Sequence, residues 1–308
     1  MLTIGTFDGV HRGHQRLLTA TVAAARRVGG RSVALTFDPH PHRVIEPEHA
    51  PLMVSSVSER CDRIAATGID ETCVLEFTQD VMRWSAHEFL ERIDTAMELS
   101  GLLIGTDFAL GHQRRGDLRF LRQWGRRRDV RVHGIAPVRD PHGPLSSTRI
   151  RAALTAGDVT TVTRLLGHPW FLDAEVEHGN KMGRTLGFPT ANLATGPHRC
   201  LPATGIYMGW ARVRDRWHRS AASIGYRPTF ADDRLTVEAH LLDFDEDIYG
   251  ETVRTVLTGR LREERAFSDV TALIAQMRRD VQTTRRRLSD RPPPSDLDPL
   301  TGSVGSRR

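Results

Sequence analysis

The first half of the chain alternates apolar, strand-like segments with segments of helical pattern. Helices are expected over His14–Val28 and from the Ser56–Glu59 and Ser85–Glu88 segments, which have the spacing of an N-terminal capping box. This alternation predicts a parallel sheet with helices on both faces, and ligands bind such sheets beyond the carboxyl ends of the strands. The predicted strands are Leu2–Thr6, Arg31–Phe37, Thr72–Phe77, Leu102–Gly105 and Val130–Val138.

From about Trp170 the pattern changes to short strands separated by turns, which predicts a small antiparallel barrel of six strands. Ser268 is the expected N-cap of a last helix that runs to about Leu288. The barrel strands recognised from the pattern are Ala174–His178, Gly205–Val213, Ser220–Ile224, Thr236–Asp243 and Thr252–Leu261.

The change of pattern places a domain joint near Gly167–Pro169. We therefore expect an α/β domain over residues 1–168 and a β-barrel domain with a terminal helix over residues 169–288. Residues 289–308 are rich in Pro, Ser and Gly, a composition typical of a disordered tail.

The composition is that of an ordinary soluble globular protein, with 39% hydrophobic and 26% charged residues among 308. No apolar run approaches the roughly 20 residues needed to span a bilayer, and the start of the chain lacks the pattern of a signal peptide. A cytoplasmic protein without membrane contact is expected. Cys61, Cys73 and Cys200 are too few and too widely spaced to indicate a disulfide framework or a zinc site.

The basic residues raise the question of nucleic-acid binding, because the net charge is +5. All but one of the 43 basic residues are arginine, and the runs Arg126–Arg128 and Arg285–Arg287 are interpreted as solvated helix faces rather than a phosphate-binding patch. The single lysine, Lys181, lies between Asn180 and Met182. The chain therefore has no P-loop and no protein-kinase lysine, so ATP would have to be bound in another way.

A glycine-rich turn after the first strand carries the first candidate site. The segment Gly5–His14 reads GTFDGVHRGH and enters the first helix. A helix N-terminus offers free N–H groups and partial positive charge to a phosphate, and Gly13 allows close approach. His11 and His14 can donate hydrogen bonds to phosphate oxygens. The turn therefore predicts a phosphate site.

The segment Ser146–Arg151, SSTRIR, is a second candidate phosphate cradle. Ser147 could be an ordinary helix N-cap, but hydroxyls, free N–H groups and arginines together also bind phosphate. Paired with the first turn, the segment is the expected other half of a triphosphate site.

The second half holds a further constellation in Gly183–Leu193, GRTLGFPTANL. Thr190 and Asn192 are two residues apart, so they share a face of an extended segment and offer oxygen ligands suited to Mg²⁺. Taken alone, Thr-x-Asn is more often a turn. Glu238 lies in an alternating strand pattern, where it is either a general base that faces the site or a carboxylate that faces solvent. Periodicity leaves both alternatives open.

The first turn and the SSTRIR segment resemble the two signatures of the nucleotidyltransferase superfamily. With Thr36–Pro41 (TFDPHP) and Gly105–Gly111 (GTDFALG), they resemble the Rossmann-like FMN adenylyltransferase module of bacterial bifunctional riboflavin kinase/FAD synthetases. The resemblance implies direct attack of the FMN phosphate on the α-phosphorus of ATP. It implies that Asp107 lines the shared nucleotide and flavin site. The ATP-binding residues that it implies are Gly5, Phe7, Asp8, Gly9, His11, Gly13, His14, Ser147, Thr148 and Arg151.

The second half resembles the riboflavin kinase domain of the same family, in PTAN, the Ile224–Phe230 turn, the Val237–Phe244 strand and Leu261–Phe267. The resemblance makes Glu238 the base for the ribityl 5′-hydroxyl. It places Arg262 and Phe267 in a flap over the flavin. It assigns ATP binding to Gly183, Gly187, Pro189, Thr190 and Asn192, the last two also as Mg²⁺ ligands.

The sequence thus predicts an enzyme that uses ATP and Mg²⁺ to convert riboflavin to FMN and FMN to FAD, with no nucleic-acid partner. The alternative is a paralogue that retains the kinase while its adenylyltransferase module is impaired or regulatory. Two departures from the family pattern concern the first site: the short start motivates the alternative, and the second bears on FMN binding. The chain starts inside the first strand, and Leu110 stands where an aromatic residue tends to precede the glycine.

Overall fold

The computed structural model describes residues 1–179, 182–226 and 235–297, and divides them into two compact units. The first unit comprises Met1–Ser147 and the second begins at Thr148. The helices α7 (Ser147–Thr155) and α8 (Val159–Leu166) precede the joint predicted from the sequence, yet they group with the second unit, because α8 packs on strands of the barrel.

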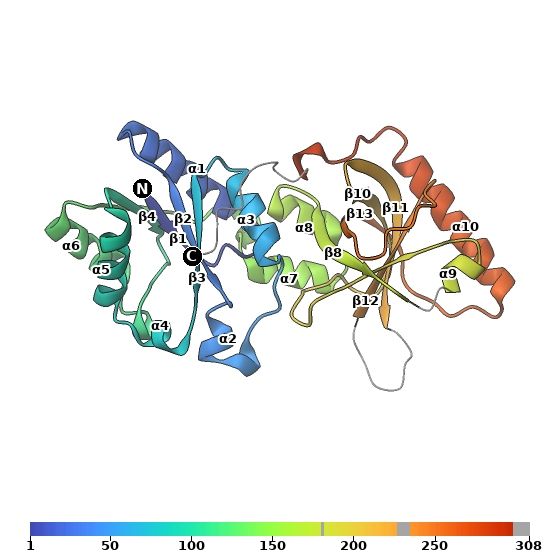
Figure 1. Cartoon of the computed structure of the whole chain (residues 1–308), viewed down its shortest axis with the longest axis horizontal. Helices are drawn as coiled ribbons and strands as arrows, with labels where there is room; N and C mark the ends of the chain where they lie inside the picture. Colours follow the sequence, from blue (N-terminus) through green and yellow to red (C-terminus); the bar gives the residue numbers. More distant parts are fainter. Residues whose placement is uncertain (180–181, 227–234, 298–308) are drawn as a thin grey trace. The chain divides into compact units, whose positions relative to one another are not determined.

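The first unit is built on a five-stranded sheet in which every pair of neighbouring strands is parallel (Figure 1). The strand order is β3-β2-β1-β4-β5, so the chain starts at the centre of the sheet and reverses its direction of winding between β3 and β4. The five strands predicted from the apolar runs are confirmed as β1 (Leu2–Ile4), β2 (Val33–Asp38), β3 (Glu71–Glu76), β4 (Gly101–Gly105) and β5 (Arg131–Ile135).

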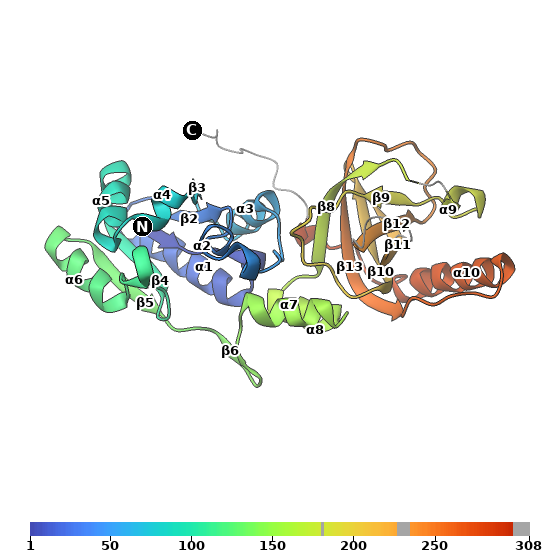
Figure 2. The ribbon, with the colours of Figure 1, turned by 90° about the horizontal axis from the view of Figure 1, so that it is seen from below.

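Alternating side chains of the central strands form two hydrophobic cores, one on each face of the sheet. Leu2 and Ile4 pack with α5 (Ala86–Met97) and α6 (Leu118–Arg128). Leu103 of β4 packs on the other face with α1 (Arg12–Arg27) and α3 (Val57–Ala65). Figures 1 and 2 show these helices on the two sides of the sheet. The predicted doubly covered parallel sheet is therefore confirmed.

The helix starts follow the predicted capping. Ser56 and Glu59 form a complete capping box at α3, and Ser85 accepts a hydrogen bond from the Glu88 amide at α5. The remaining short elements of the first unit are η1 (Asp8–Val10), α2 (His42–Ile45), η2 (Pro47–His49), α4 (Gln79–Arg83), η3 (His112–Arg114), β6 (Arg139–Asp140) and β7 (Gly143–Pro144).

The second unit contains a closed, antiparallel, six-stranded barrel in the order β10-β11-β12-β9-β8-β13, as predicted. The sixth strand, β9, is only three residues long and lies inside the segment that the sequence singled out for Mg–ATP binding. The strands are β8 (Trp170–Glu177), β9 (Ala191–Leu193), β10 (Gly205–Val213), β11 (Arg216–Tyr226), β12 (Leu235–Leu241) and β13 (Thr252–Arg262), with the short helix α9 (Met182–Thr185) before β9.

The terminal helix α10 (Val270–Arg287) begins one residue later than predicted. Its N-cap is Asp269, whose carboxylate accepts from the Ala272 amide, whereas the Ser268 hydroxyl donates to Asp269. A carboxylate at this position also interacts favourably with the helix dipole.

The tail was predicted to be disordered from residue 289, and its described part departs from that prediction. Residues Ser295–Leu297 form a 3₁₀ turn, η4, and Leu297 is fully buried against Phe171 and Trp210 of the barrel. The Arg254 guanidinium, paired with Asp173, donates to the Leu297 carbonyl. One apolar side chain and one buried cation thus order a segment whose composition alone indicates disorder.

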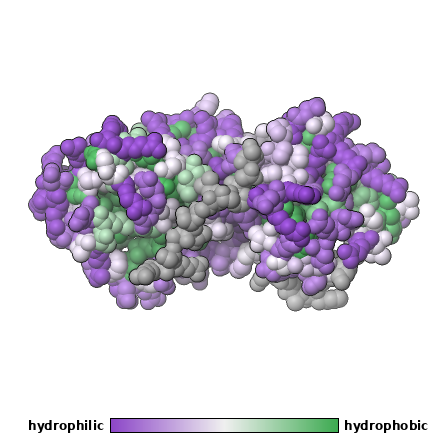
Figure 3. Space-filling view, turned by 45° about the horizontal axis from the view of Figure 1, so that its top comes forward, coloured by the Kyte–Doolittle hydropathy of each residue, from purple (hydrophilic) through white to green (hydrophobic). Residues whose placement is uncertain are grey.

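The face of the molecule drawn in Figure 3 is mainly hydrophilic, with hydrophobic residues in small separate areas. No helix in the described part of the chain combines the length and the apolarity needed to cross a membrane.

Candidate active sites

The loop after β1 has a strained backbone. Phe7 and Val10 have φ of 47° and 40°, in the left-handed region that is costly for a β-branched residue such as Val10, by about 1–3 kcal/mol. The fully buried Asp8 carboxylate holds the loop by accepting from the amides of Val54 at 2.9 Å and Ser55 at 3.1 Å. The Asp8 side chain, which the family resemblance assigns to ATP binding, is therefore engaged in fixing the loop.

His11 is the N-cap of α1. Its Nδ1 accepts hydrogen bonds from the amides of Gly13 at 3.1 Å and His14 at 3.3 Å. An imidazole that accepts at Nδ1 carries its proton on Nε2, so Nε2–H is left to donate to a ligand. Burial lowers the pKa of His11 to about 4, although the charge of Asp8 opposes this shift. His11 is thus neutral at physiological pH.

His14 lies face to face with His11, with ring centroids 3.6 Å apart, and meets the edge of the Phe7 ring. Burial lowers the pKa of His14 well below its usual value, and the charges of His11 and Arg60 act in the same direction. Its Nδ1 is buried and has no hydrogen-bond partner within the described residues. The two rings therefore form a neutral stacked pair at the start of α1. His11 Nε2 and His14 Nδ1 are the ring atoms left to hydrogen-bond with a ligand.

The predicted second cradle begins beside this loop. Ser147, the first residue of α7, donates its hydroxyl hydrogen to the carbonyl of Asp8 at 2.9 Å. Thr148 and Arg151 follow in the first turns of α7, within the second unit. Asp107 lies just beyond β4, the strand next to β1, and is exposed. The carboxyl ends of β1 and β4 therefore carry the two predicted segments of the first unit.

In the second unit, the structure shows which way the Glu238 side chain points, a question that the alternating pattern left open. Glu238 on β12 is the register partner of Asn192 on β9, and its Oε2 accepts from the Thr190 hydroxyl at 3.2 Å. Its neighbours Val237 and Ala239 point the other way and are buried. Glu238, Thr190 and Asn192 line one cavity, so the predicted base and both predicted metal ligands are brought together.

That cavity has a volume of about 420 Å³ and lies between the barrel strands and α10. Leu273, Met277 and Val281 give it an apolar wall along one face of α10. Arg262 and Phe267, the predicted flap residues, also line it. A large, partly apolar space with a few polar groups at one end suits a flat aromatic ring system that carries a polar chain.

The wall formed by Arg262 is tied to α10. Its guanidinium donates to both Asp280 oxygens, at 2.8 Å from Nη2 to Oδ2, and Gln276 donates to Asp280 Oδ1 at 2.8 Å. The Arg262 and Arg265 guanidinium carbons lie 5.8 and 5.1 Å from the centre of the Phe267 ring. The side chains of Arg262, Arg265 and Phe267 thus pack together in the wall of the cavity.

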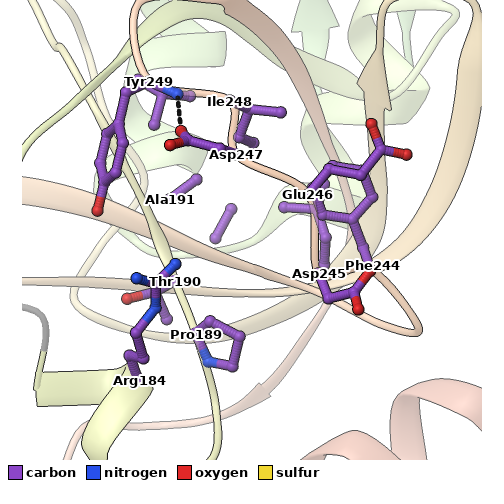
Figure 4. Close-up of a pocket in the computed structure, with 13 residues that line it drawn as sticks. Arg184, Pro189, Thr190, Ala191, Phe244, Asp245, Glu246, Asp247, Ile248 and Tyr249 are labelled. Carbon is purple, nitrogen blue, oxygen red and sulfur yellow. Dashed lines mark hydrogen bonds between the residues drawn. The ribbon is translucent and has the colours of Figure 1, made fainter.

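A smaller cavity of about 160 Å³ shares Thr190 with the larger one. In Figure 4, Arg184, Pro189 and Thr190 lie at its lower left, and the segment Phe244–Tyr249 passes around its right side and top. Ala239 and Leu241 also line it, and they alternate along β12 with the residues that face the larger cavity. The two cavities therefore lie on opposite faces of β12 and meet at Thr190.

The glycine-rich segment before β9 packs closely against Asn192 and the Phe188 carbonyl. A Cβ atom added at Gly179 would lie 2.2 Å from Asn192 Nδ2, and one at Gly183 would lie 2.4 Å from the Phe188 carbonyl oxygen. Close approach to backbone therefore requires glycine at position 183, whereas a side chain at position 179 would displace the Asn192 amide. Gly187, with φ of 84°, makes the turn that follows α9.

The oxygen atoms at this junction suit a hard cation. Thr190 and Asn192 supply neutral oxygens and Glu238 a carboxylate, the donor types that Mg²⁺ takes together with phosphate oxygens. Within residues 1–179, 182–226 and 235–297, no three His, Cys, Asp or Glu side chains form a metal cluster.

Sequence reasoning missed three residues at these sites: Arg60, Gly179 and Asp280. Arg60 and Asp280 lie on helices and were interpretable only as solvated charges, while Gly179 carried a signal in being the first glycine of the loop. Residues 227–230 of the predicted Ile224–Phe230 turn lie outside the described residues, and so does Lys181.

Comparison with known proteins assigns each unit a match. Residues 1–149 match the FAD synthetase family model, and residues 166–288 match the riboflavin kinase family model. A crystal structure described as a macrolide-efflux protein from Streptococcus pneumoniae is 33% identical, with a TM-score of 0.84 over 92% of this chain and 93% of that chain.

Curated relatives match along almost the full length. The proteins from Pseudomonas fluorescens and Listeria monocytogenes are 36% and 33% identical, each over 92% of this chain and 91% of their own, and that from Escherichia coli K12 is 32% identical over the same shares. All three are named bifunctional riboflavin kinase/FMN adenylyltransferase. With both cavities, the paired histidines and both family models in agreement, the chain belongs to the bifunctional riboflavin kinase/FMN adenylyltransferase family.

Proposed function

We propose that the chain phosphorylates riboflavin to FMN in its second unit and adenylylates FMN to FAD in its first, with ATP as the donor in both reactions. One observation carries the proposal: Thr190 and Glu238 are hydrogen-bonded at the junction of two cavities of unequal size. A general base and a metal ligand at such a junction suit the transfer of a phosphoryl group from one bound molecule to another.

In the kinase reaction, the larger cavity takes the flavin, with its ring against the apolar wall of α10 and its ribityl chain towards Glu238. The smaller cavity takes the nucleotide, with Arg184 available to its phosphates. Glu238 accepts the proton of the 5′-hydroxyl as the oxygen forms its bond to the γ-phosphorus. The bond between that phosphorus and the β–γ bridging oxygen breaks, and ADP leaves. Thr190 and Asn192 would hold Mg²⁺, which would neutralise phosphate charge.

In the adenylylation reaction, an FMN phosphate oxygen attacks the α-phosphorus of ATP and pyrophosphate leaves. No proton must be removed from the nucleophile, so neutral histidines are adequate. His11 donates from Nε2 to a phosphate oxygen, and His14 is held beside it by stacking. Ser147 binds the triphosphate together with Thr148 and Arg151, which follow it in α7, and Asp107 lines the site. Positioning and electrostatic stabilisation supply the catalysis.

The alternative function, a kinase with an impaired adenylyltransferase module, has less support. The FAD synthetase match extends over residues 1–149, and the strained loop with its two histidines is intact. Leu110, the second departure from the family pattern, is buried in a hydrophobic core of the first unit.

The test is chromatography of products over time, with riboflavin, ATP and Mg²⁺ added to the full chain. FMN should appear first and FAD should follow, and excess EDTA should stop both. Absence of FMN would overturn the kinase assignment. FMN that accumulates without FAD, even when FMN is supplied directly, would establish the alternative.

A further inference from the structure

Arg60 is a buried cation beneath the histidine loop. It lies in the first turn of α3 and only 1% of its surface is exposed. Its Nη1 donates to the Thr6 carbonyl at 2.7 Å, and its Nη2 donates to the Phe37 carbonyl at 3.0 Å. Thr6 follows β1 and Phe37 belongs to β2, so one guanidinium joins the carboxyl ends of two neighbouring strands.

The surrounding contacts fix Arg60 in this place. The capping box of Ser56 and Glu59 sets the start of α3, and Ser55, just before it, accepts from the Gly9 amide at 3.0 Å. The Asp8 carboxylate binds the amides of the same segment. The start of α3 and the loop after β1 are therefore tied together, and Arg60 cannot move without displacing the loop.

The charge of Arg60 acts on the histidines. Burial lowers the pKa of Arg60, while Asp8, Cys61 and Asp38 oppose that shift, and arginine remains charged under all ordinary conditions. The charged or titratable groups that act on His14 are His11 from its own helix and Arg60 from α3, and both lower the pKa of His14. Asp8 acts on His11.

A triphosphate site needs positive charge, and the two histidines do not supply it because they are neutral. A guanidinium that two backbone carbonyls already hold in place supplies charge without reorganising during the reaction, which is the property that makes electrostatic catalysis effective. We propose that Arg60 is a positioning residue for adenylyl transfer, which fixes the loop that carries His11 and His14 and places a permanent positive charge beneath it. This inference rests on the proposed adenylyltransferase function of the first unit.

The test compares three substitutions in the full chain: Arg60→Lys keeps the charge, Arg60→Gln keeps donors without charge, and Arg60→Met keeps neither. FMN adenylylation is measured from pH 5.5 to 8.5 with FMN supplied, and riboflavin phosphorylation is measured on the same samples. The matched control is Arg27→Met, at an exposed arginine whose guanidinium bonds within its own helix.

Arg60→Lys should retain adenylylation within about threefold, whereas Arg60→Gln and Arg60→Met should lose about tenfold or more, in line with removal of a buried charge-assisted bond. The acid limb of the pH profile should also shift to higher pH in the two neutral variants, because, besides burial and the charge of His11, the charge of Arg60 lowers the pKa of His14. Phosphorylation and the control should be unchanged.

A purely structural role predicts the same loss at every pH, with no change in the shape of the profile, and would overturn the proposal. Equal activity of Arg60→Gln and Arg60→Lys would also overturn it. If Arg60→Met does not fold, the adenylylation rates of Arg60→Lys and Arg60→Gln decide whether the charge matters. Failure of the wild type to make FAD would instead refute the proposed function itself.

Discussion

The Thr190 hydroxyl donates a hydrogen bond to Glu238 Oε2 at 3.2 Å, which couples the proposed metal ligand directly to the proposed base. Because the hydroxyl is the donor in this bond, the lone pairs of the Thr190 oxygen are left for a cation, which would bind beside the carboxylate without breaking the bond. The proposed metal ligand and the proposed base would then be held in one geometry.

Glu238→Gln should abolish the kinase reaction selectively. The amide keeps the size of the side chain but does not accept a proton, so kcat for FMN formation should fall by about 10² to 10⁴. Adenylylation of supplied FMN should be unchanged, since it takes place in the other unit. Both rates are measured on one preparation, and parallel loss of both would contradict separate sites.

Gly179→Ala should weaken metal binding at the kinase site. The new methyl group would lie 2.2 to 2.6 Å from the atoms of the Asn192 amide, which must move away from its place beside Glu238. We expect the Mg²⁺ concentration for half-maximal FMN formation to rise by about tenfold, equivalent to about 1.4 kcal/mol. Gly196→Ala, where the added atom meets open space, is the matched control. Equal Mg²⁺ dependence of the two variants would argue against the role of Asn192.

Asp280→Asn should raise KM for riboflavin more than it lowers kcat. Asp280 holds Arg262 in the wall of the larger cavity, and it does not touch the junction where the phosphoryl group is transferred. An increase in KM of about tenfold is expected for loss of one charged, buried partner. Asp290→Asn, at an exposed position beyond α10, is the control. A selective fall in kcat with unchanged KM would show that Asp280 acts on the chemical step instead.

The His11 cap should be sensitive to acid. The pKa of His11 is lowered to about 4 in the folded chain, from an ordinary value of 6.5. The stability that this neutral cap contributes is therefore complete above pH 6.5 and is lost as pH falls towards 4, because the unfolded chain binds the proton first. Protonation at Nδ1 also removes the acceptor of two backbone bonds.

Hydrogen exchange of the Gly13 and His14 amides, corrected for intrinsic rates, measures this effect. Protection should fall between pH 7 and pH 5 in the wild type. In His11→Asn, whose side-chain oxygen caps without titrating, it should depend less on pH. The same pH dependence in both proteins would assign the change to another group.

Much of the fold follows from local patterns in the sequence. The capping box at Ser56 and the apolar run Gly205–Val213 depend on residues close together in the chain, and both were predicted with the bounds that the structure has. Strand β9 was not recognised because three residues are too few to display a period. The face of Glu238 was undetermined because alternation is symmetric: it separates two faces without saying which one is lined by a cavity.

The residues missed at the sites depend on distant partners. Buried Arg60 donates to a carbonyl that lies 54 positions away in the sequence, and buried Asp280 accepts from a guanidinium 18 positions away. A charged residue on an amphipathic helix has the same local pattern whether it meets water or a buried partner. Leu297 was missed for the converse reason, because a Pro-rich neighbourhood concealed a single side chain that completes the core of the barrel.

The two cavities lie on opposite faces of β12 and share Thr190 among the described residues, which also bears on the kinetics of the kinase. With flavin and nucleotide in the cavities proposed for them, the two molecules would meet the point of transfer from opposite faces of the strand. We therefore expect no compulsory order of substrate binding or of product release.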